Sequence, residues 1–172
     1  MIDSRTRYAS LVLLLAVTPA GAVELHYAPI ENLERIDVLQ LNSARKTIDM
    51  AAYVLTDAPL IGALAAAAYR GVKIRLYLDG GQAGGEAMAP VGPFGTLLTA
   101  PHVIVKQKRS GKPIMHLQSY CVDGRLFRTG SASFSAAGLK QQDNDLLLFD
   151  DSRMCSDFTI NFDVLWDGKD AE

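Results

Sequence analysis

The sequence predicts an α/β fold in which a mixed, mostly parallel sheet is flanked by helices. Segments rich in β-branched residues alternate with helix-like segments along most of the chain. Two successive strand–helix–strand units imply parallel strands joined by right-handed crossovers. The pair Asp123-Gly124, which lies between two apolar runs, predicts a hairpin that adds antiparallel pairing. A chain of 172 residues with 49% apolar content accommodates one domain with a sizeable core.

The first half of the chain carries the strand–helix alternation. We expect strands at 24–27, 47–55 and 72–78, and helices at 32–46 and 56–69. The first helix has an approximate apolar face that includes Leu33 and Leu41. Thr56 or Asp57 supplies an N-cap for the second helix, and Gly71 ends it.

The second half begins with a Gly-rich segment at 80–95, which we interpret as a long loop or a loose helix without an assigned role. Strands are expected after it at 102–108, 116–123, 126–129 and 145–149. The loop at 130–135 leads into a short helix that runs through Leu139, and residues 156–166 form a closing helix.

The N-terminus has the pattern of a secretory signal peptide. Arg5 and Arg7 precede a short apolar run at 11–17, and small residues follow at 20–22. The apolar run is shorter than the roughly 20 residues that a bilayer-spanning helix needs. We therefore expect a signal peptide at 1–22, a single domain at 23–172, and a periplasmic or secreted location after cleavage.

The two cysteines bear on that location. An exported chain meets an oxidising compartment, where a disulfide between Cys121 and Cys155 is chemically allowed. Cys121 also lies in a predicted strand on a core-facing position, where a free cysteine behaves as a small apolar residue. This position favours two buried thiols over a disulfide.

Charge argues against a strong generic nucleic-acid binder. Removing residues 1–22 moves the net charge from −2 to about −3. Four basic residues nevertheless cluster just before His116, and we call this stretch, residues 106–112, the basic segment: Lys106, Lys108, Arg109 and Lys112. It is either a solvated loop or a phosphate-binding one.

The candidate chemistry centres on His116, with Gln118 two positions later, Asp123 five positions after that, and the loop Gly130–Ser135 further on. In a strand, His116 and Gln118 share one face and can contact one ligand together. A neutral imidazole can attack phosphorus and then depart, which divides one displacement into two easier steps. Gln118, Ser131 and Ser133 would supply uncharged donors to the phosphate.

This pattern resembles the signature of the phospholipase D superfamily, His-x-Lys-x4-Asp followed by Gly-Ser-x-Asn. The sequence keeps the His, Asp, Gly and Ser, but Gln118 replaces the Lys and Ser133 replaces the Asn. The order of strands, loop and helix from 25 to 166 is also similar to that family. The chain looks most like its short bacterial members, which carry one motif and include nuclease-type and small phospholipase D-like proteins.

The resemblance implies a phospholipase D-like fold and a homodimer, because two motifs must meet in one site and this chain has one. One His116 would form the phosphohistidine while the other protonates the leaving oxygen. Asp123 would order its strand end and turn. Asp143 is expected where relatives place an acid that orients the histidine, and Asp145 shares its strand face. The family implies no metal or other cofactor.

Two functions remain open at this point. The first is a phosphodiesterase that hydrolyses phospholipid or nucleic-acid phosphodiesters, weakened by the loss of the motif Lys. A lost charge-assisted hydrogen bond in both subunits would cost about 3 to 6 kcal/mol, roughly two to four orders of magnitude in rate. The alternative is an inactive relative that binds phosphate-bearing ligands or acts as a dimeric scaffold. Spacings typical of zinc sites, phosphate loops and nucleophile elbows are absent from the sequence.

Overall fold

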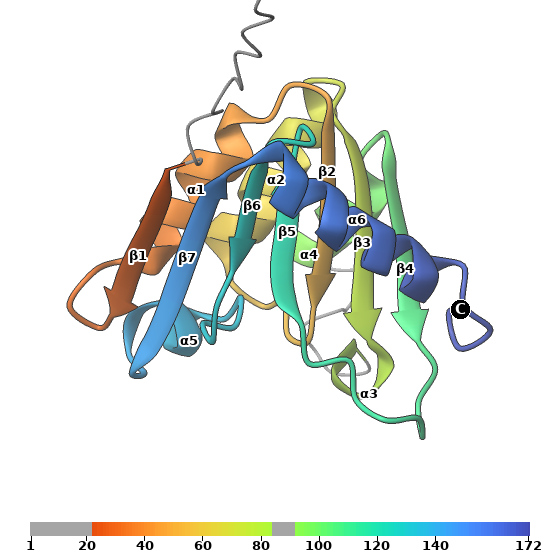
Figure 1. Ribbon diagram of the computed structural model, residues 1–172. Coiled ribbons are helices and arrows are strands. Elements are labelled where there is room, and N and C mark those ends of the chain that lie inside the picture. The colour runs from red at the N-terminus through yellow and green to blue at the C-terminus, as the bar shows by residue number, and fades with distance from the viewer. Residues whose placement is uncertain (1–21, 84–91) are drawn as a thin grey trace, which may run out of the picture.

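A seven-stranded sheet organises the chain in the computed structural model, which describes residues 22–83 and 92–172 (Figure 1). Its strands are β1 (Val23–Ala28), β2 (Thr47–Ala52), β3 (Lys73–Asp79), β4 (Val103–Lys108), β5 (Gln118–Val122), β6 (Leu126–Thr129) and β7 (Asn144–Asp150). The helices are α1 (Leu33–Ser43), α2 (Ala58–Tyr69), α3 (Gly80–Ala83), α4 (Pro93–Thr99), α5 (Ala136–Lys140) and α6 (Ser152–Trp166). The strand order is β1-β7-β6-β5-β2-β3-β4.

The pairing of the strands confirms a mixed sheet and corrects its expected mostly parallel character. Among the described strands, only β2 with β3 and β3 with β4 pair in parallel. The pairs β1–β7, β2–β5, β5–β6 and β6–β7 are antiparallel. The connections account for part of this pattern: helical crossovers join β2 to β3 and β3 to β4, whereas the tight turn at Asp123-Gly124 joins β5 to β6.

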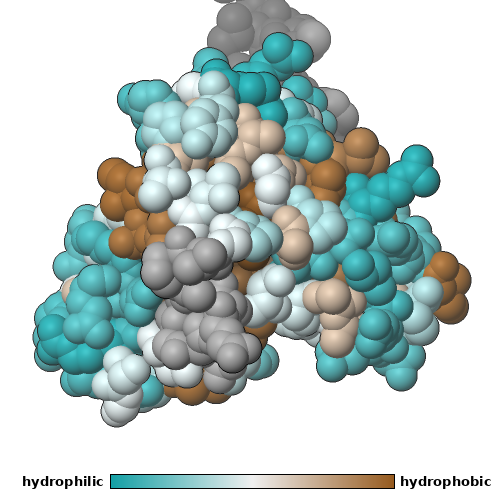
Figure 2. Space-filling view, turned by 180° about the vertical axis from the view of Figure 1, so that it is seen from behind, coloured by the Kyte–Doolittle hydropathy of each residue, from teal (hydrophilic) through white to brown (hydrophobic). Residues whose placement is uncertain are grey.

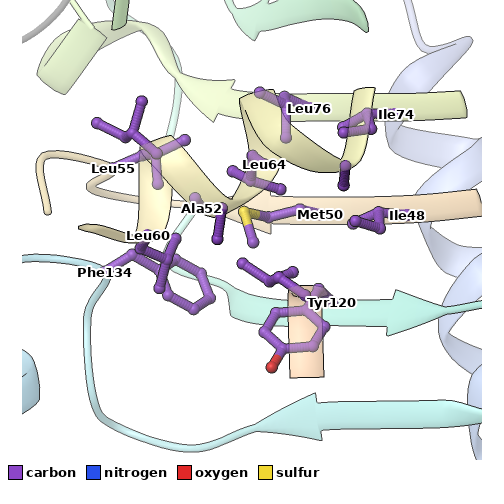
Figure 3. Packing of buried hydrophobic residues seen from close by; sticks show 14 of the residues in the cluster. Ile48, Met50, Ala52, Leu55, Leu60, Leu64, Ile74, Leu76, Tyr120 and Phe134 are labelled. Carbon is purple, nitrogen blue, oxygen red and sulfur yellow. The ribbon is translucent and has the colours of Figure 1, made fainter. Parts of the chain in front are cut away.

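Helices cover both faces of the sheet. The larger core lies under α1, α2 and α4, where Met50, Leu64, Tyr120 and Phe134 pack together (Figure 3). On this side of the molecule, the outer surface is mostly hydrophilic, with apolar patches between the polar side chains (Figure 2). A smaller core lies under α6 on the opposite face and includes Phe162.

Local signals set most helix boundaries. Asn32 caps α1 through a bond from the Arg35 N–H, and Asp57 caps α2 through a bond from the Leu60 N–H. The first helix ends at Ser43, earlier than the predicted boundary of 46. The backbone N–H groups at 45–47 donate to the carboxylate of Asp123, which is distant in the sequence, instead of extending the helix.

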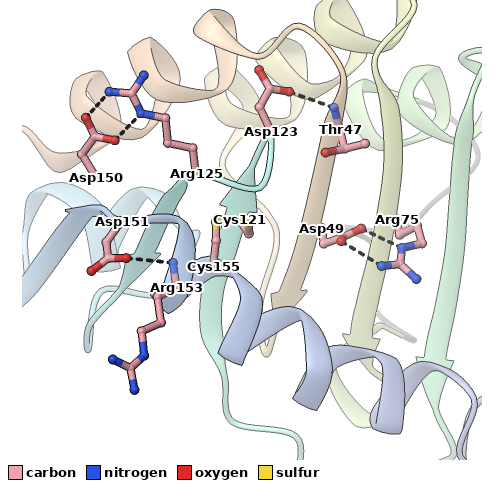
Figure 4. Close-up of a disulfide and its surroundings, with 10 residues drawn as sticks. All are labelled: Thr47, Asp49, Arg75, Cys121, Asp123, Arg125, Asp150, Asp151, Arg153 and Cys155. Atoms are coloured by element: carbon pink, nitrogen blue, oxygen red, sulfur yellow. Dashed lines mark hydrogen bonds and ion pairs between the residues drawn. A yellow bond between two sulfur atoms is a disulfide. The ribbon is translucent and has the colours of Figure 1, made fainter. Parts of the chain in front are cut away.

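The turn at Asp123 joins β5 to β6. Asp123 and Gly124 both have positive φ, 54° and 67°, as a two-residue hairpin turn requires. The Asp123 carboxylate accepts hydrogen bonds from the N–H groups of Arg45, Lys46 and Thr47 at 2.7 to 2.9 Å, and Figure 4 shows the bond from Thr47. These backbone donors lower the pKa of Asp123, although burial opposes them. The carboxylate therefore ties the end of the α1 segment to the hairpin.

The expectation of two free thiols is wrong, because Cys121 of β5 and Cys155 of α6 form a disulfide (Figure 4). Their Cα atoms are 5.5 Å apart, within the usual range for such a bond. The core-facing position of Cys121 was predicted, but α6 packs against that face and brings Cys155 to it. The disulfide therefore fastens α6 to the sheet.

Two sequence predictions fall largely outside the described residues. The signal peptide at 1–22 precedes them except for Ala22, and the middle of the Gly-rich segment, residues 84–91, lies in the gap. The flanks of that segment form α3 and α4. Among the described residues, no helix is long and apolar enough to cross a membrane.

Candidate active site

The residues of the predicted site gather at one edge of the sheet, where β2, β3 and β6 end and β5 begins (Figure 1). Gln118 is the first residue of β5 and pairs with Ala52, the last residue of β2. The Ser131–Ser133 loop follows the end of β6. The hairpin turn at Asp123 lies at the opposite end of β5. Asp123 therefore orders the hairpin and is remote from the candidate site.

His116 lies just before β5, which corrects the strand predicted from 116 to 123. The Met115 N–H donates to the Asp79 carboxylate at 2.8 Å, so the chain departs from the strand ladder there. One residue after His116, the Leu117 carbonyl accepts the Tyr53 N–H at 2.9 Å. These two backbone bonds flank His116 and hold it at the sheet edge.

The His116 ring is exposed and packs on Tyr53, with 4.7 Å between the ring centroids. No hydrogen bond joins the ring to another residue of the described chain. Both ring nitrogens are therefore available to a ligand or to a second subunit. An exposed imidazole without an internal partner suits nucleophilic attack better than a core histidine does.

Gln118 is buried, with 5% of its surface exposed, and its side-chain Oε1 has no hydrogen-bond partner in the described residues. A buried polar group without a partner is uncommon, because its desolvation cost of about 1 to 3 kcal/mol goes uncompensated. The amide occupies the sequence position of the family's Lys. The unpartnered Oε1 is an acceptor, so the group that can bind a phosphate oxygen is the amide NH2, for which the described residues also show no hydrogen bond.

Ser131 is engaged by Asp145, at the start of β7. The Ser131 N–H and hydroxyl both donate to Asp145 Oδ1 at 2.6 Å, and the Asp145 N–H returns a bond to the Ser131 Oγ at 2.9 Å. The Ser131 side chain and N–H lower the pKa of Asp145, while burial opposes them. Ser131, predicted to donate to phosphate, thus spends both donors on a carboxylate in this structure.

Ser133 is half-buried and faces the start of α5. Its hydroxyl lies 3.0 Å from that of Ser135, the N-cap of α5. A Cβ on Gly138 would lie 2.3 Å from Ser133 Oγ, so a glycine is needed for the helix to approach the loop this closely. Ser133 therefore supports the loop, and either hydroxyl of the Ser133–Ser135 pair can be the donor.

Asp143 is exposed in the turn before β7, and the structure gives it no hydrogen bond or ion pair with His116. It lies with Ser131 and Asp145 beside a surface hollow of about 740 Å³, whose apolar side is formed by Tyr27 and Ile30. The expected orienting contact between Asp143 and the histidine is absent from the described contacts. The acids near the loop face the hollow instead.

Sequence reasoning missed a buried ion pair behind this site. Arg128 of β6 and Asp37 of α1 are both fully buried and are 3.0 Å apart at Nη2 and Oδ2. Burial raises the pKa of Asp37, and Arg128 opposes this shift. The position of Asp37 midway between Leu33 and Leu41, four residues from each, places it on the apolar helix face and was the available signal.

The basic segment is largely neutralised by the residues that follow α6. Lys112 pairs with Asp170 at 3.2 Å and Arg109 with Glu172 at 3.3 Å. The Lys106 ammonium donates to the Trp166 carbonyl at 2.7 Å. Backbone hydrogen bonds between 107–109 and 170–172 also pair the last residues of the chain with β4, the outermost strand on that side of the sheet. A contact between Lys112 and a phosphate at the site would require this ion pair to break.

Metal ligation has no support in the described residues, where no cluster of three or more His, Cys, Asp or Glu side chains is placed to hold an ion. The arrangement offers an exposed imidazole, an unpartnered buried amide and a serine loop at one sheet edge. These groups suit nucleophilic chemistry or binding at a phosphate.

A family model described as "Cardiolipin synthase, PLD-like domain" matches residues 38–166. The chain therefore belongs to the phospholipase D-like family, as a member with one motif, which confirms the resemblance inferred from its sequence. Two relatives are named mitochondrial cardiolipin hydrolase. The protein of Chlamydomonas reinhardtii is 24% identical over 127 residues, 74% of this chain and 54% of the relative. That of Xenopus laevis is 24% identical over 133 residues, 77% of this chain and 60% of the relative.

This chain thus spans little more than half the length of the curated relatives it matches. Two solved structures are covered almost entirely. The phospholipase D family member Nuc of Salmonella typhimurium has a TM-score of 0.74 at 21% identity, covering 88% of this chain and 96% of Nuc. NucT of Helicobacter pylori has a TM-score of 0.76 at 19% identity, covering 87% and 97%. These likenesses confirm the phospholipase D-like fold.

Proposed function

We propose that the chain is a phosphodiesterase that works through a phosphohistidine in a homodimeric site. The observation that carries the proposal is the pair of His116, exposed and without a hydrogen bond, and Gln118, buried two residues away. The Gln118 side chain makes no hydrogen bond in the described residues, so its NH2 donors remain for a phosphate. Both stand in the motif order of the family to which the chain belongs. An attacking group and a vacant hydrogen-bonding position adjoin each other at one sheet edge.

The proposed reaction has two displacements at phosphorus. A neutral His116 nitrogen attacks phosphorus and forms a P–N bond as the P–O bond to the leaving alcohol breaks. The His116 of the second subunit gives its proton to the departing oxygen. The same histidine then takes a proton from water, whose oxygen attacks phosphorus and releases the first imidazole. The products are an alcohol and a phosphomonoester, and the enzyme returns to its starting state.

The homodimer follows from the chemistry. One exposed histidine cannot be both nucleophile and acid toward opposite sides of the same phosphorus, and the motif occurs once in the chain. A two-fold axis close to His116 would bring two copies of the edge together. A monomeric mass in light scattering at assay concentrations would refute this part of the proposal.

One observation favours the alternative of an inactive relative that binds phosphate-bearing ligands. The Ser131 donors are occupied by Asp145, whose lowered pKa keeps a negative charge beside the loop. A phosphate entering there would meet a carboxylate unless Ser131 changed partners. A site that binds weakly and turns over slowly, or not at all, would have this arrangement.

For the substrate, we propose a phospholipid in preference to a nucleic acid. Binding to a nucleic acid needs unpaired cationic side chains, whereas Lys112 and Arg109 of the basic segment already form ion pairs with acidic residues. The apolar side of the hollow next to Ser131 is compatible with lipid chains. We further propose that the chain is exported, which the disulfide between Cys121 and Cys155 supports.

The test measures hydrolysis of a chromogenic phosphodiester by the purified protein without added metal. His116→Asn and Gln118→Lys are compared with the parent, and His102→Asn is the matched control. His102 is exposed at a separate position before β4, and its positive φ of 62° is one that asparagine tolerates. Phospholipid vesicles and single-stranded oligonucleotides are then assayed separately.

We expect His116→Asn to abolish turnover and His102→Asn to leave it intact. Gln118→Lys places a lysine in both subunits and is expected to raise the rate by roughly two to four orders of magnitude, the size of two charge-assisted hydrogen bonds. An inactive parent whose Gln118→Lys variant gains activity would establish the lapsed enzyme. Absence of hydrolysis by the parent and all variants, or hydrolysis that persists in His116→Asn, would refute the phosphodiesterase proposal.

A further inference from the structure

The ion pair behind the site has more bonds than charge balance needs. Arg128 Nε and Nη2 reach the two Asp37 oxygens at 3.1 and 3.0 Å. The Tyr120 hydroxyl donates to the same carboxylate at 2.9 Å. All three side chains are fully buried, so α1, β5 and β6 are joined by a polar cluster inside the larger core.

The remaining Arg128 donors reach the candidate site. Nη1 donates to the Gln118 carbonyl at 2.8 Å, and Nη2 also donates to the Ala132 carbonyl at 3.1 Å. The guanidinium lies 4.5 Å from the ring centroid of Phe134. One planar group therefore holds the backbone of both Gln118 and the Ser131–Ser133 loop.

These two carbonyls lie beyond the last β5–β6 pair, where Gln118 still pairs with Ala52 of β2 but has no partner on β6. Pairing between β5 and β6 begins at Tyr120 with Arg128, so Gln118 and Ala132 both lie beyond that ladder. Arg128 bridges the two segments at the point where they diverge. The planar fork of an arginine defines the direction of both bonds, which a lysine ammonium would not do.

Stability is a poor explanation for the cluster. Removing two charges from water is costly, and replacing a buried ion pair by apolar residues of similar size is often neutral or stabilising. A geometric role accounts better for a guanidinium whose three nitrogens all donate, to acceptors on three separate segments. Arg128 has no exposed surface, so it does not touch a ligand itself.

We propose that Arg128, held by Asp37, is the positioning residue that sets Gln118 and the Ser131–Ser133 loop in register with His116. The inference rests on the proposed function, because it assigns the two positioned segments to the phosphate site. It predicts that the geometry of this edge depends on the buried pair even when the fold does not.

The test replaces the polar cluster by apolar residues in one variant, Asp37→Leu/Tyr120→Phe/Arg128→Met, which leaves no stranded charge or hydroxyl. The matched control is Asp49→Leu/Arg75→Met. Arg75 binds Asp49 at 2.7 and 2.8 Å on the face covered by α6, so it is also an Arg–Asp pair between packed elements. It lies on the sheet face opposite the polar cluster.

Three measurements are made on the parent and both variants: the urea midpoint, the Kd for inorganic phosphate from the His116 ring resonances, and amide hydrogen exchange of Ser131 and Ala132. We expect both variants to fold cooperatively. In the triple variant the Kd should rise by roughly 10- to 100-fold, the loss of about one hydrogen bond to a charged group, and the two loop amides should exchange faster. The control should match the parent in both.

The outcomes separate the two proposals. Unchanged loop exchange in a folded triple variant overturns the positioning role, whatever the parent binds. Faster loop exchange in that variant with no phosphate binding by the parent supports the positioning role and counts against a phosphate site. An equal loss of phosphate affinity in the control would show a general effect of lost ion pairs and would also overturn the proposal. If the triple variant fails to fold, Arg128→Lys, which keeps the charge without the fork, replaces it, with the same readouts and criteria.

Discussion

Removal of the disulfide should lower stability strongly, because it closes a long loop between a strand and the final helix. Cys121 and Cys155 are 34 residues apart. In the chain-entropy description, a loop of that length restricts the unfolded state by about 3.8 kcal/mol at 25 °C. Both cysteines are buried, so we replace each by alanine and not by serine, whose hydroxyl would be left without a partner in the core.

The assay is urea unfolding of the oxidised parent and of Cys121→Ala/Cys155→Ala. With a urea dependence of about 2 kcal/mol/M, a loss of about 3.8 kcal/mol lowers the midpoint by roughly 2 M. Reducing agent should lower the parent's midpoint by a similar amount and leave that of the variant unchanged. The reduced parent thus serves as an internal control for the lost packing of the two sulfur atoms.

Two results would refute this reasoning. Two reactive thiols in the denatured, unreduced parent would show that the bond is not formed. A midpoint that reductant does not move would show that α6 holds its place through the smaller core alone. A confirmed disulfide would in turn support a protein that matures in an oxidising compartment.

Three further predictions concern charged groups. Arg128→Met alone strands the buried Asp37 carboxylate and should lower the free energy of unfolding by about 3 to 5 kcal/mol in urea titrations, so a loss below about 1 kcal/mol would contradict the buried pair. Burial raises the pKa of Asp57 from 3.8 to about 6, so the folded chain holds a proton that the unfolded chain releases, and stability should fall as pH rises from about 4 to 6. Asp57→Asn, which can still cap α2, should flatten this slope in urea midpoints across that range, and an unchanged slope would rule out Asp57 as its source. Asp170→Asn/Glu172→Gln should change stability by less than about 1 kcal/mol and tighten phosphate binding at low salt, whereas unchanged binding would show that the basic segment does not reach the site.

Much of the fold was predictable because its signals are local. The cap at Asp57 and the turn at Asp123-Gly124 act within a few residues, so the sequence places them well. The predicted ends of elements were less accurate where distant groups intervene. The first helix stops early because its following N–H groups bind Asp123, and β5 starts late because the Met115 N–H binds Asp79.

The candidate site divides in the same way. Motif spacing singled out His116, Gln118, Ser131 and Ser133, and the structure brings them to one sheet edge. It could not tell which donors remain free, because Ser131 is engaged by Asp145, fourteen residues away on another strand. Spacing likewise could not tell that Asp143, in the turn before β7, lines the hollow beside Ser131 and forms no hydrogen bond or ion pair with His116.

The sequence by itself determined the alternation of strands and helices, the hairpin, the single motif and hence the family, because periodicity, caps and motif spacing are properties of neighbouring residues. Only the tertiary structure decided the mainly antiparallel pairing, the disulfide and the Arg128–Asp37 pair. Each of these joins segments far apart in the chain. Their formation depends on which strand lies beside which and which helix covers it, and burial then determines whether a charged group must find a partner.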